Sequence, residues 1–347
     1  MAGLAFSPDG ATLATSGGGR RDRTVDVWQT LTRQLRYVLL PGKGSNTDLA
    51  FSPDGRILAT WGYGPAIKLW GVETGNLKSV VAESHDFVHV SISADSHTLA
   101  TANNTDFSVK LWDIETGRLK ATLPHPNPKQ FEFGVGADVV FNPNGRTLAT
   151  CSHDTLYFWD AKTLQLLITL VDPSVERSTG PLGLRTLKGF SHGDTIYTLM
   201  FSPDGRVLAT ASRDGTAKLW DGASGKLKAT LRHDRKVTRL AFTLDGRTVA
   251  TGSEDRTARL WDVATGRLIT TLDHRGTVWS IDFSPDGKLL ATAADNDHSV
   301  KIWDVATGKL LDELKDARYP VAFSPDGRTL ATASKDATVL LWDMPPR

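Results

Sequence analysis

Histidine, aspartate and serine recur along the chain at fixed distances from aromatic residues, which raises the question of catalysis. His192, His233 and His274 each lie nine residues before a phenylalanine. An aspartate lies six residues before each of several tryptophans, and a serine often lies two residues before that aspartate. Together these are the residue types of a nucleophilic hydrolase triad. The aspartates are Asp22, Asp106, Asp214, Asp255, Asp297 and Asp336, and the serines are Ser212, Ser253 and Ser334.

The repetition of this set argues against catalysis. A hydrolase needs one triad, in one pocket, with hydrogen-bond donors for the oxyanion. Here the same residue types return about every 41 residues. We find no single, non-repeated cluster of titratable residues in the sequence. We therefore predict a structural role for the repeated set, no catalytic residues and no enzymatic activity.

Metal and nucleotide sites are weakly supported. The nine histidines are spread over several repeats, and Cys151 is the one cysteine. Gly17-Gly18-Gly19 followed by Arg20 could suit an anion, but it lacks the Gly-Lys-Ser/Thr ending and the strand-to-helix context of a phosphate loop. We interpret it as a long turn. The sequence therefore predicts no metal ion and no cofactor.

Composition narrows the class of protein. The 40 lysines and arginines nearly balance the 39 aspartates and glutamates, whereas nucleic-acid binders usually have a basic excess. No apolar run approaches the roughly 18 residues of a membrane helix, and the first residues lack the pattern of a signal peptide. A single cysteine excludes a disulfide within the chain. We expect a soluble, cytoplasmic protein with no nucleic-acid or membrane partner.

Two anchor motifs divide the chain into eight repeats. The motif F-x-P-[D/N]-G occurs six times, and the degenerate strings ISADS and FTLDG fill its gaps. Trp-Asp also occurs six times, with Trp28-Gln29 and Trp70-Gly71 as degenerate forms. The two motifs alternate strictly, with one large insertion. The phenylalanines are Phe6, Phe51, Phe141, Phe201, Phe283 and Phe323, and the Trp-Asp tryptophans are Trp112, Trp159, Trp220, Trp261, Trp303 and Trp342.

Residues 237–272 show the elements of one repeat. Four β-branched or apolar runs, VTRLAF, RTVATGS, ARLWD and RLITTL, are separated by TLDG, EDRT and VATG. Short runs of this kind, bounded by Gly, Pro, Asp and Ser, predict strands joined by tight turns. We name these strands a, b, c and d in order. Strand b alternates large and small residues, as in LATAS, which suits a sheet buried on both faces.

The eight repeats resemble the WD-repeat family of β-propellers, in which four-stranded blades stand around a channel. The resemblance covers the chain from Phe6 to Trp342. It implies one all-β domain over 1–347, an eight-bladed WD-repeat β-propeller, with a seven-bladed ring plus an irregular extra repeat as the alternative. The strings SPDG, LATAS and WDVATG resemble bacterial arrays of this family. The expected blades span residues 1–40, 45–82, 86–123, 135–170, 193–231, 235–272, 276–314 and 318–344, with an insertion at 171–191.

The resemblance also implies a buried hydrogen-bond tetrad in each complete blade. In the sixth blade, His233 would bond to Asp255 and Ser253. Ser253 would in turn reach the indole N–H of Trp261, so that buried polar groups are satisfied. The tetrad residues are His192, Ser212, Asp214 and Trp220; His233, Ser253, Asp255 and Trp261; and His274, Asp297 and Trp303. Blades that lack members should be held by packing alone; the departures are Gly42, Gly64, Ala294 and Leu314.

One rim of the ring, formed by the d–a and b–c loops, varies between repeats and is the expected binding face. Aromatic residues near the start of strand a and charges in the b–c turns have the composition of an interface hot spot. The alternative is that the aromatic side chains merely plug the channel. The residues predicted to contact a partner are Tyr197, Arg213, Lys236, Thr238, Glu254, Trp279, Asn296, Tyr319 and Lys335.

The insertion at 171–191 should project from the same rim. Its prolines and glycines argue against a packed helix. A surface loop is the simplest interpretation. The string LGLRTLKG resembles another strand d, so a hairpin or an added edge strand is the alternative.

Counting strands leaves the last blade incomplete. Strands a, b and c occur eight times, but strand d occurs seven times, so the eighth blade should have three strands. Its strand c, Thr338 to Trp342, would be an apolar open edge to which another strand could add. We predict a non-catalytic scaffold that binds protein or peptide partners. The alternative is the sensor or regulatory propeller of a larger bacterial signalling enzyme, with catalysis outside this chain.

Overall fold

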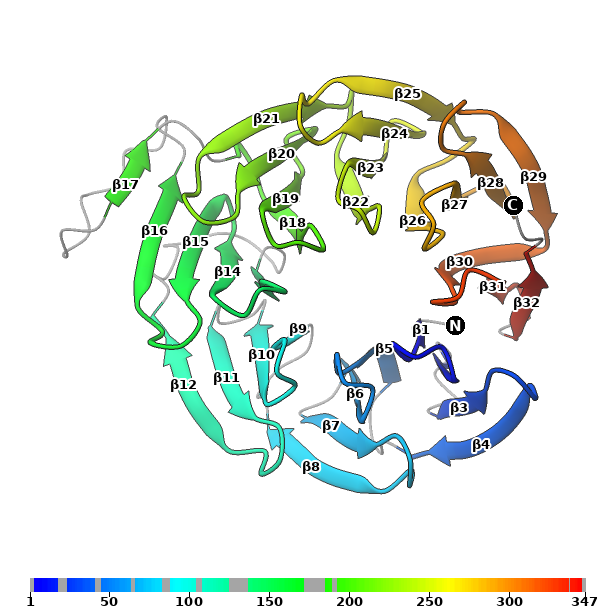
Figure 1. Ribbon diagram of the computed structural model, residues 1–347, viewed down its shortest axis with the longest axis horizontal. Coiled ribbons are helices and arrows are strands. Elements are labelled where there is room, and N and C mark those ends of the chain that lie inside the picture. Colours follow the sequence, from blue (N-terminus) through cyan, green and yellow to red (C-terminus); the bar gives the residue numbers. More distant parts are fainter. Residues whose placement is uncertain are drawn as a thin grey trace.

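The computed structural model describes residues 3–17, 24–40, 45–63, 66–82, 88–103, 108–124, 137–171, 185–188, 192–336 and 338–344. Within these ranges every regular element is a β-strand. The strands form eight sheets that stand in a ring (Figure 1). The protein is therefore an eight-bladed β-propeller. This confirms the predicted fold over the seven-bladed alternative.

The first four blades follow the order of the sequence. Blade 1 contains β1 (Leu4–Phe6), β2 (Thr12–Ser16), β3 (Val25–Gln29) and β4 (Gln34–Leu39). Blade 2 contains β5 (Ser45–Phe51), β6 (Ile57–Tyr63), β7 (Ala66–Gly71) and β8 (Leu77–Ala82). Blade 3 contains β9 (Val88–Ile92), β10 (Thr98–Asn103), β11 (Val109–Asp113) and β12 (Leu119–Leu123). Blade 4 contains β13 (Ala137–Phe141), β14 (Thr147–Ser152), β15 (Thr155–Asp160), β16 (Leu166–Val171) and β17 (Arg185–Lys188).

The second half of the ring is more regular. Blade 5 contains β18 (Ile196–Phe201), β19 (Val207–Ser212), β20 (Thr216–Asp221) and β21 (Leu227–Arg232). Blade 6 contains β22 (Val237–Phe242), β23 (Thr248–Ser253), β24 (Thr257–Asp262) and β25 (Leu268–Asp273). Blade 7 contains β26 (Val278–Phe283), β27 (Leu289–Ala294), β28 (Ser299–Asp304) and β29 (Leu310–Lys315). Blade 8 contains β30 (Ala317–Phe323), β31 (Thr329–Ser334) and β32 (Val339–Asp343).

Two blades depart from four strands. Blade 8 has three, in the order β30-β31-β32, as predicted from the strand count. Blade 4 has five, because β17 pairs in parallel with β16, with Ile168 opposite Arg185. The described part of the insertion, 185–188, is thus an added edge strand rather than a plain loop. The rest of the insertion lies outside the described residues.

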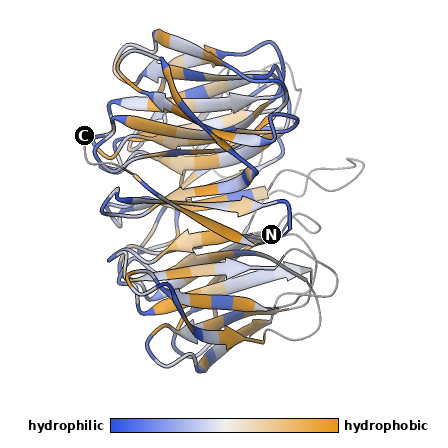
Figure 2. Ribbon diagram, turned by 90° about the vertical axis from the view of Figure 1, so that its right-hand side faces the viewer, coloured by the Kyte–Doolittle hydropathy of each residue, from blue (hydrophilic) through white to orange (hydrophobic). Residues whose placement is uncertain are grey.

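The core lies between the blades. The strand-b side chains of Leu208, Ala209 and Ala211 are fully buried. Leu208 packs in a cluster with Phe158 of the preceding blade, while Ala209 packs with Trp261 of the following blade. The large and small faces of each strand b therefore meet different neighbours, and each sheet is buried on both sides. Figure 2 shows the ring edge-on, with apolar bands running through the stacked sheets.

A hydrogen bond from a strand-c tryptophan to a strand-b threonine recurs in every blade. In blade 6, Nε1 of Trp261 donates to Oγ1 of Thr251 at 2.8 Å. The other pairs are Trp28–Thr15, Trp70–Thr60, Trp112–Thr101, Trp159–Thr150, Trp220–Thr210, Trp303–Thr292 and Trp342–Thr332, at 2.7 to 3.2 Å. Each bond satisfies an indole N–H inside the sheet stack.

In blades 5 to 7 a histidine and an aspartate extend this bond into a chain. In blade 6, Nδ1 of His233 lies 2.8 Å from Asp255 Oδ2, and Nε2 lies 2.7 Å from Thr251 Oγ1. His192 makes the same contacts with Asp214 and Thr210 in blade 5. Burial alone would raise the pKa of Asp214, but the hydrogen bonds from His192 and Thr216 outweigh it and lower that pKa.

The expected bonds of Ser253 to His233 and to Trp261 were wrong, because the hydroxyl of Thr251 makes both. Thr251 lies on the same face of strand b as the indole, two residues before the end of the strand. Ser253 instead accepts the N–H of Asp255 at 3.0 Å and donates to the carbonyl of Arg235 at 3.1 Å. Ser212 has the equivalent contacts in blade 5. The serines therefore link the d–a loop to the b–c turn, next to the Trp–Thr–His–Asp hydrogen-bond chain but not as members of it.

The expectation that blade 7 is held by packing alone was also wrong. Ala294 replaces only the outer serine. His274 keeps its bonds to Asp297, at 2.5 Å, and to Thr292, at 3.0 Å. Leu314 does not stand at the histidine position of blade 8, contrary to the prediction. It pairs with Val300 as Leu231 pairs with Ala217, and it is buried among apolar side chains. Asp316, two residues later, stands where blades 5 to 7 have histidine. Gly42 and Gly64 of blade 2, and the loop at 18–23, lie outside the described residues.

Thr251→Val should destabilise the protein, because valine keeps the shape of threonine but removes the oxygen that Trp261 and His233 share. We expect a loss of roughly 1–3 kcal/mol in the free energy of unfolding, the usual cost of unsatisfied buried polar groups. Denaturant titration would measure it. Thr332→Val is the matched control, because Thr332 bonds the half-buried Trp342 and blade 8 has Asp316 where blades 5 to 7 have histidine. Equal losses in the two variants would show that the histidine contributes nothing.

Candidate partner-binding rim

The predicted aromatic residues gather at the start of the innermost strands of blades 5, 7 and 8. Tyr197 and Trp279 are half-buried, and Tyr319 is 43% exposed. Nε1 of Trp279 donates to Oδ2 of Asp295 at 2.6 Å, and the guanidinium of Arg239 lies 5.9 Å from the centre of the indole ring. Burial raises the pKa of Tyr319, and the nearby Asp295 carboxylate raises it further. Asp295 therefore fixes the Trp279 indole and lies next to Tyr319.

Ion pairs border Tyr197 on the rim of blades 5 and 6. Nζ of Lys236 lies 2.9 Å from Glu254 Oε1, and Nε of Arg213 lies 3.7 Å from Asp194 Oδ2. These side chains are partly or largely exposed, so each pair contributes little stability. They can exchange their partners for groups of a docked molecule at small cost. Asn296 and Lys335 are exposed in the equivalent turns of blades 7 and 8.

Thr238 does not belong to this rim surface, contrary to the prediction. Its side chain is 4% exposed, and its hydroxyl donates to the carbonyl of Val278 in the next blade at 2.6 Å. The small side chain of Thr238 fits between blades 6 and 7, whereas the larger side chains of Trp279 and Tyr319 at the same position remain partly exposed. Thr238 therefore joins blades 6 and 7 and is not available to a partner.

Charged side chains near the ring axis were not predicted. Asp48, His89, Asp138 and Arg239 occupy the same position of strand a in blades 2, 3, 4 and 6. Nδ1 of His89 lies 3.2 Å from Asp138 Oδ1. Burial opposes the charged form of His89, but the Asp138 and Asp48 carboxylates outweigh it and raise its pKa. Aligning strand a of all repeats would have shown these residues, three positions before the phenylalanine anchor or its equivalent.

Some of these inner side chains also tie neighbouring blades together. Asp138 accepts the N–H of Leu199 in blade 5 at 2.8 Å. Asp282 accepts the N–H of Phe323 in blade 8 at 2.7 Å. Serines do the same at two joints: Ser91 accepts from Phe141 at 3.0 Å, and Ser280 accepts from Val321 at 3.1 Å. Polar residues on the inner strands therefore satisfy backbone groups of the next blade.

The opposite rim carries a recess of about 600 Å³ between blades 3 and 4. Ser93, Lys120, Phe141, Asn144 and Lys162 are among the residues that line it. Nζ of Lys120 is held by Asp113 at 3.3 Å and Thr98 at 3.0 Å. The near-identical turns of this rim gave no sequence signal for a recess.

Among the residues that the structure describes, no three histidine, cysteine, aspartate or glutamate side chains are grouped to hold a metal ion. The same residues include no helix long and apolar enough to cross a membrane.

Comparison with known proteins identifies the family. The model of the WD domain, G-beta repeat, matches residues 2–29, 77–113, 133–160, 184–221, 225–262, 266–304 and 321–343. The chain belongs to the WD-repeat family. The computationally designed Ika8 protein shares the fold, with a TM-score of 0.73 and 23% identity over 99% of this chain and 95% of that chain.

Curated relatives match this WD-repeat chain over shorter stretches. Periodic tryptophan protein 2 of Arabidopsis thaliana is 28% identical over 197 residues, which cover 49% of this chain and 21% of that protein. WD repeat-containing protein 1 of Gallus gallus is 36% identical over 94 residues, 27% of this chain and 13% of that protein. The chain thus matches less than a quarter of the length of these relatives. Both are eukaryotic, so the expected bacterial type is not confirmed.

Asp282→Asn should stabilise the protein at alkaline pH. Burial raises the pKa of Asp282 to about 7, against the lowering effect of the N–H groups of Phe323 and Phe283. A raised folded pKa means that the stability from this group is complete below the unfolded value near 4 and is lost as the pH rises through 7. Asparagine keeps an oxygen for Phe323 and does not ionise.

The measurement is the difference in Tm between variant and wild type across pH 5 to 8.5. We expect it to grow with pH for Asp282→Asn. Asp286→Asn is the control, because that carboxylate is exposed in a turn and the Ser284 hydroxyl helps to lower its pKa. A difference for Asp282→Asn that stays constant with pH would contradict the raised pKa.

Proposed function

We propose that the protein is a non-catalytic scaffold that binds protein or peptide partners on the d–a/b–c rim of blades 5 to 8. The observation that carries this proposal is the aromatic pair Trp279 and Tyr319 beside Asp295, whose carboxylate fixes the Trp279 indole. Large aromatic side chains that are held in place lose little entropy on binding and supply much contact area. Tyr197, Arg213, Lys236, Glu254, Asn296 and Lys335 would complete the contact surface.

The names of the curated relatives support a role in assembling other molecules. Ribosome assembly protein 4 of Saccharomyces cerevisiae is 40% identical over 55 residues, 16% of this chain and 10% of that protein. Probable cytosolic iron-sulfur protein assembly protein 1 of Cryptococcus neoformans is 32% identical over 89 residues, 24% of this chain and 19% of that protein. We infer the general role of a scaffold from these names, and not their particular cargo.

Charge should act mainly on the rate of association. The ion pairs Lys236–Glu254 and Arg213–Asp194 alternate in sign along the rim. A partner with a matching alternation would be steered into register before the aromatic side chains make contact. Trp279 would then govern how long the complex lasts.

A second candidate is the regulatory propeller of a larger signalling enzyme. The observation in its favour is that the curated relatives are much longer than the part this chain matches. A catalytic domain in the same open reading frame would favour this candidate. Its absence would favour the free scaffold.

Trp279→Ala should abolish capture of the physiological partner and leave the fold intact, because the indole is half-buried at the rim and not in the blade core. Quantitative pull-down against wild type measures the first effect, and circular dichroism the second. Arg213→Glu should mainly slow association with the partner so identified. Lys162→Glu on the opposite rim is the control. If both rim variants recover the same partners as wild type, while Lys162→Glu does not, the binding face is the other one.

A further inference from the structure

The outer edge of blade 8 is its strand c, β32, because the described part of this blade has no strand d. In the seven other blades, the strand-c residue three positions before the tryptophan is at most 1% exposed; the residues are Val25, Ile67, Val109, Leu156, Ala217, Ala258 and Val300. The equivalent Val339 of β32 is half-buried, and so are Leu340 and Leu341. Among the residues that the structure describes, β32 pairs with β31 alone. Its outward backbone groups are a template for another strand.

The other blades of the same molecule show what such a strand looks like. Each strand d has a leucine opposite the tryptophan, as Leu227 lies opposite Trp220. It is the first residue of the strand except in β4, where Leu35 follows Gln34. Four residues later comes an apolar side chain that is at most 7% exposed; these are Leu39, Val81, Leu123, Leu170, Leu231, Leu272 and Leu314. We number these strand-d positions 1 and 5. A strand added to β32 would place position 1 opposite Trp342 and position 5 opposite Val339.

The c–d turn of blade 1 presents an unusual leucine beside this edge. Leu31 is 90% exposed. Its equivalent in blade 3 is Glu115, which pairs with Lys78, at position 2 of the preceding strand d, at 2.8 Å. Arg33 of the same turn lies 2.7 Å from Asp343 of β32, so the turn does reach blade 8. An apolar residue at position 2 of an added strand would cover Leu31.

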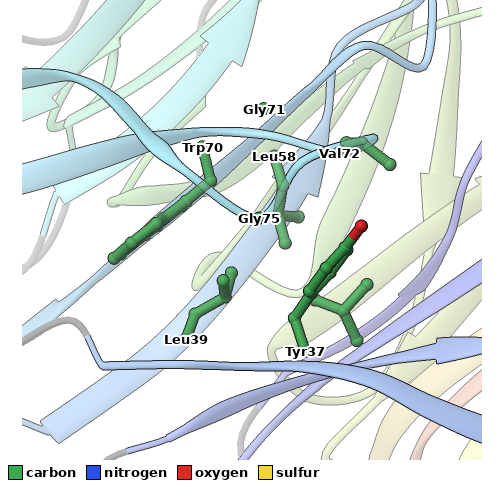
Figure 3. Close-up of a pocket in the computed structure, with 8 residues that line it drawn as sticks. Tyr37, Leu39, Leu58, Trp70, Gly71, Val72 and Gly75 are labelled. Carbon is green, nitrogen blue, oxygen red and sulfur yellow. The ribbon is translucent and has the colours of Figure 1, made fainter.

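The side chain of Arg33 limits the size of the residue that an added strand can have at position 3. Five other blades have glycine at the turn position of Arg33. In blade 2, a Cβ on this glycine, Gly75, would come 2.8 Å from the ring of Tyr37, which is at position 3 of the preceding strand d (Figure 3). In blade 4 the turn has Leu164 instead, and the facing residue is the small Ala121. A large residue is therefore found either in the c–d turn or at position 3 of the strand d that faces it, but not at both. Beside Arg33, position 3 must be small.

A second copy of this chain fits the edge poorly. β32 is recessed by one strand spacing, roughly 5 Å, behind the outer strands β29 and β4 of the flanking blades (Figure 1). Two recessed edges cannot meet, because the outer strands of the neighbouring blades would collide first. A single extended segment can enter the gap.

We propose that blade 8 binds an extended segment of a partner protein as its fourth strand, antiparallel to β32, with the pattern leucine, apolar, small, any residue, leucine. Backbone hydrogen bonds to β32 would supply affinity, and positions 2, 3 and 5 would supply selectivity. This surface lies on the outer wall of the ring and does not depend on the rim proposed above.

The test uses the peptide KLLATLR, based on residues 226–232 with the second lysine replaced by leucine. Fluorescence anisotropy measures binding, and hydrogen exchange locates it. We expect saturable binding that slows exchange of the β32 amides. The control KLLATDR should bind roughly tenfold more weakly or not at all, because position 5 buries a whole leucine side chain. Leu31→Asp should weaken KLLATLR and leave the fold unchanged.

A size exchange tests the register. KLLYTLR should bind wild type at least about tenfold more weakly than KLLATLR, because its tyrosine meets Arg33. Arg33→Gly should restore its binding, as Gly75 accommodates Tyr37, and Arg33 has a φ of 57° that glycine adopts freely. Equal binding of all three peptides would overturn the proposal. So would β32 amides already protected in the free monomer, or a dimer that must dissociate before the peptide binds.

Discussion

The bond from tryptophan N–H to threonine hydroxyl is the constraint on which the ring depends. It crosses from strand c to strand b diagonally: Trp220 is paired with Leu208, and its indole reaches Thr210 two residues further on. A slip of one residue would turn the threonine to the opposite face and leave the indole N–H unsatisfied in the core. Because the bond is present in all eight blades, it fixes the same register eight times and makes the blades stack as equal units.

In blades 5 to 7 a histidine and an aspartate extend this bond, and the extended chain fixes the position of the rim loops. The chain from Trp261 through Thr251 and His233 ends at Asp255, in the b–c turn. The loops of the d–a/b–c rim are therefore anchored to the blade core on this side of the ring. The aromatic side chains of the proposed binding surface stand beside these anchored loops, where the scaffold holds them in place at low entropic cost.

Most of the fold could be predicted because it is periodic. Eight alternating anchors gave the blade count, and counting strands gave the incomplete blade 8. The sequence could not show which hydroxyl meets the indole, since Thr251 and Ser253 lie on the same face and three-dimensional distance decides between them. It also could not show that Thr238 sinks into a joint. That depends on the neighbouring blade, which a single repeat does not reveal.

The hydrogen bonds between inner strands of neighbouring blades determine how the ring would respond to force. Side chains of one blade accept backbone N–H groups of the next at the joints 3/4, 4/5 and 7/8. At the joint between blades 8 and 1, Pro320 and Ala322 occupy the corresponding positions and carry no side-chain acceptor. The described ends of the chain lie in these two adjacent blades. Tension between segments attached there would act directly across this joint, where the inner strands lack such bonds and the Arg33–Asp343 ion pair links the outer part of the two blades.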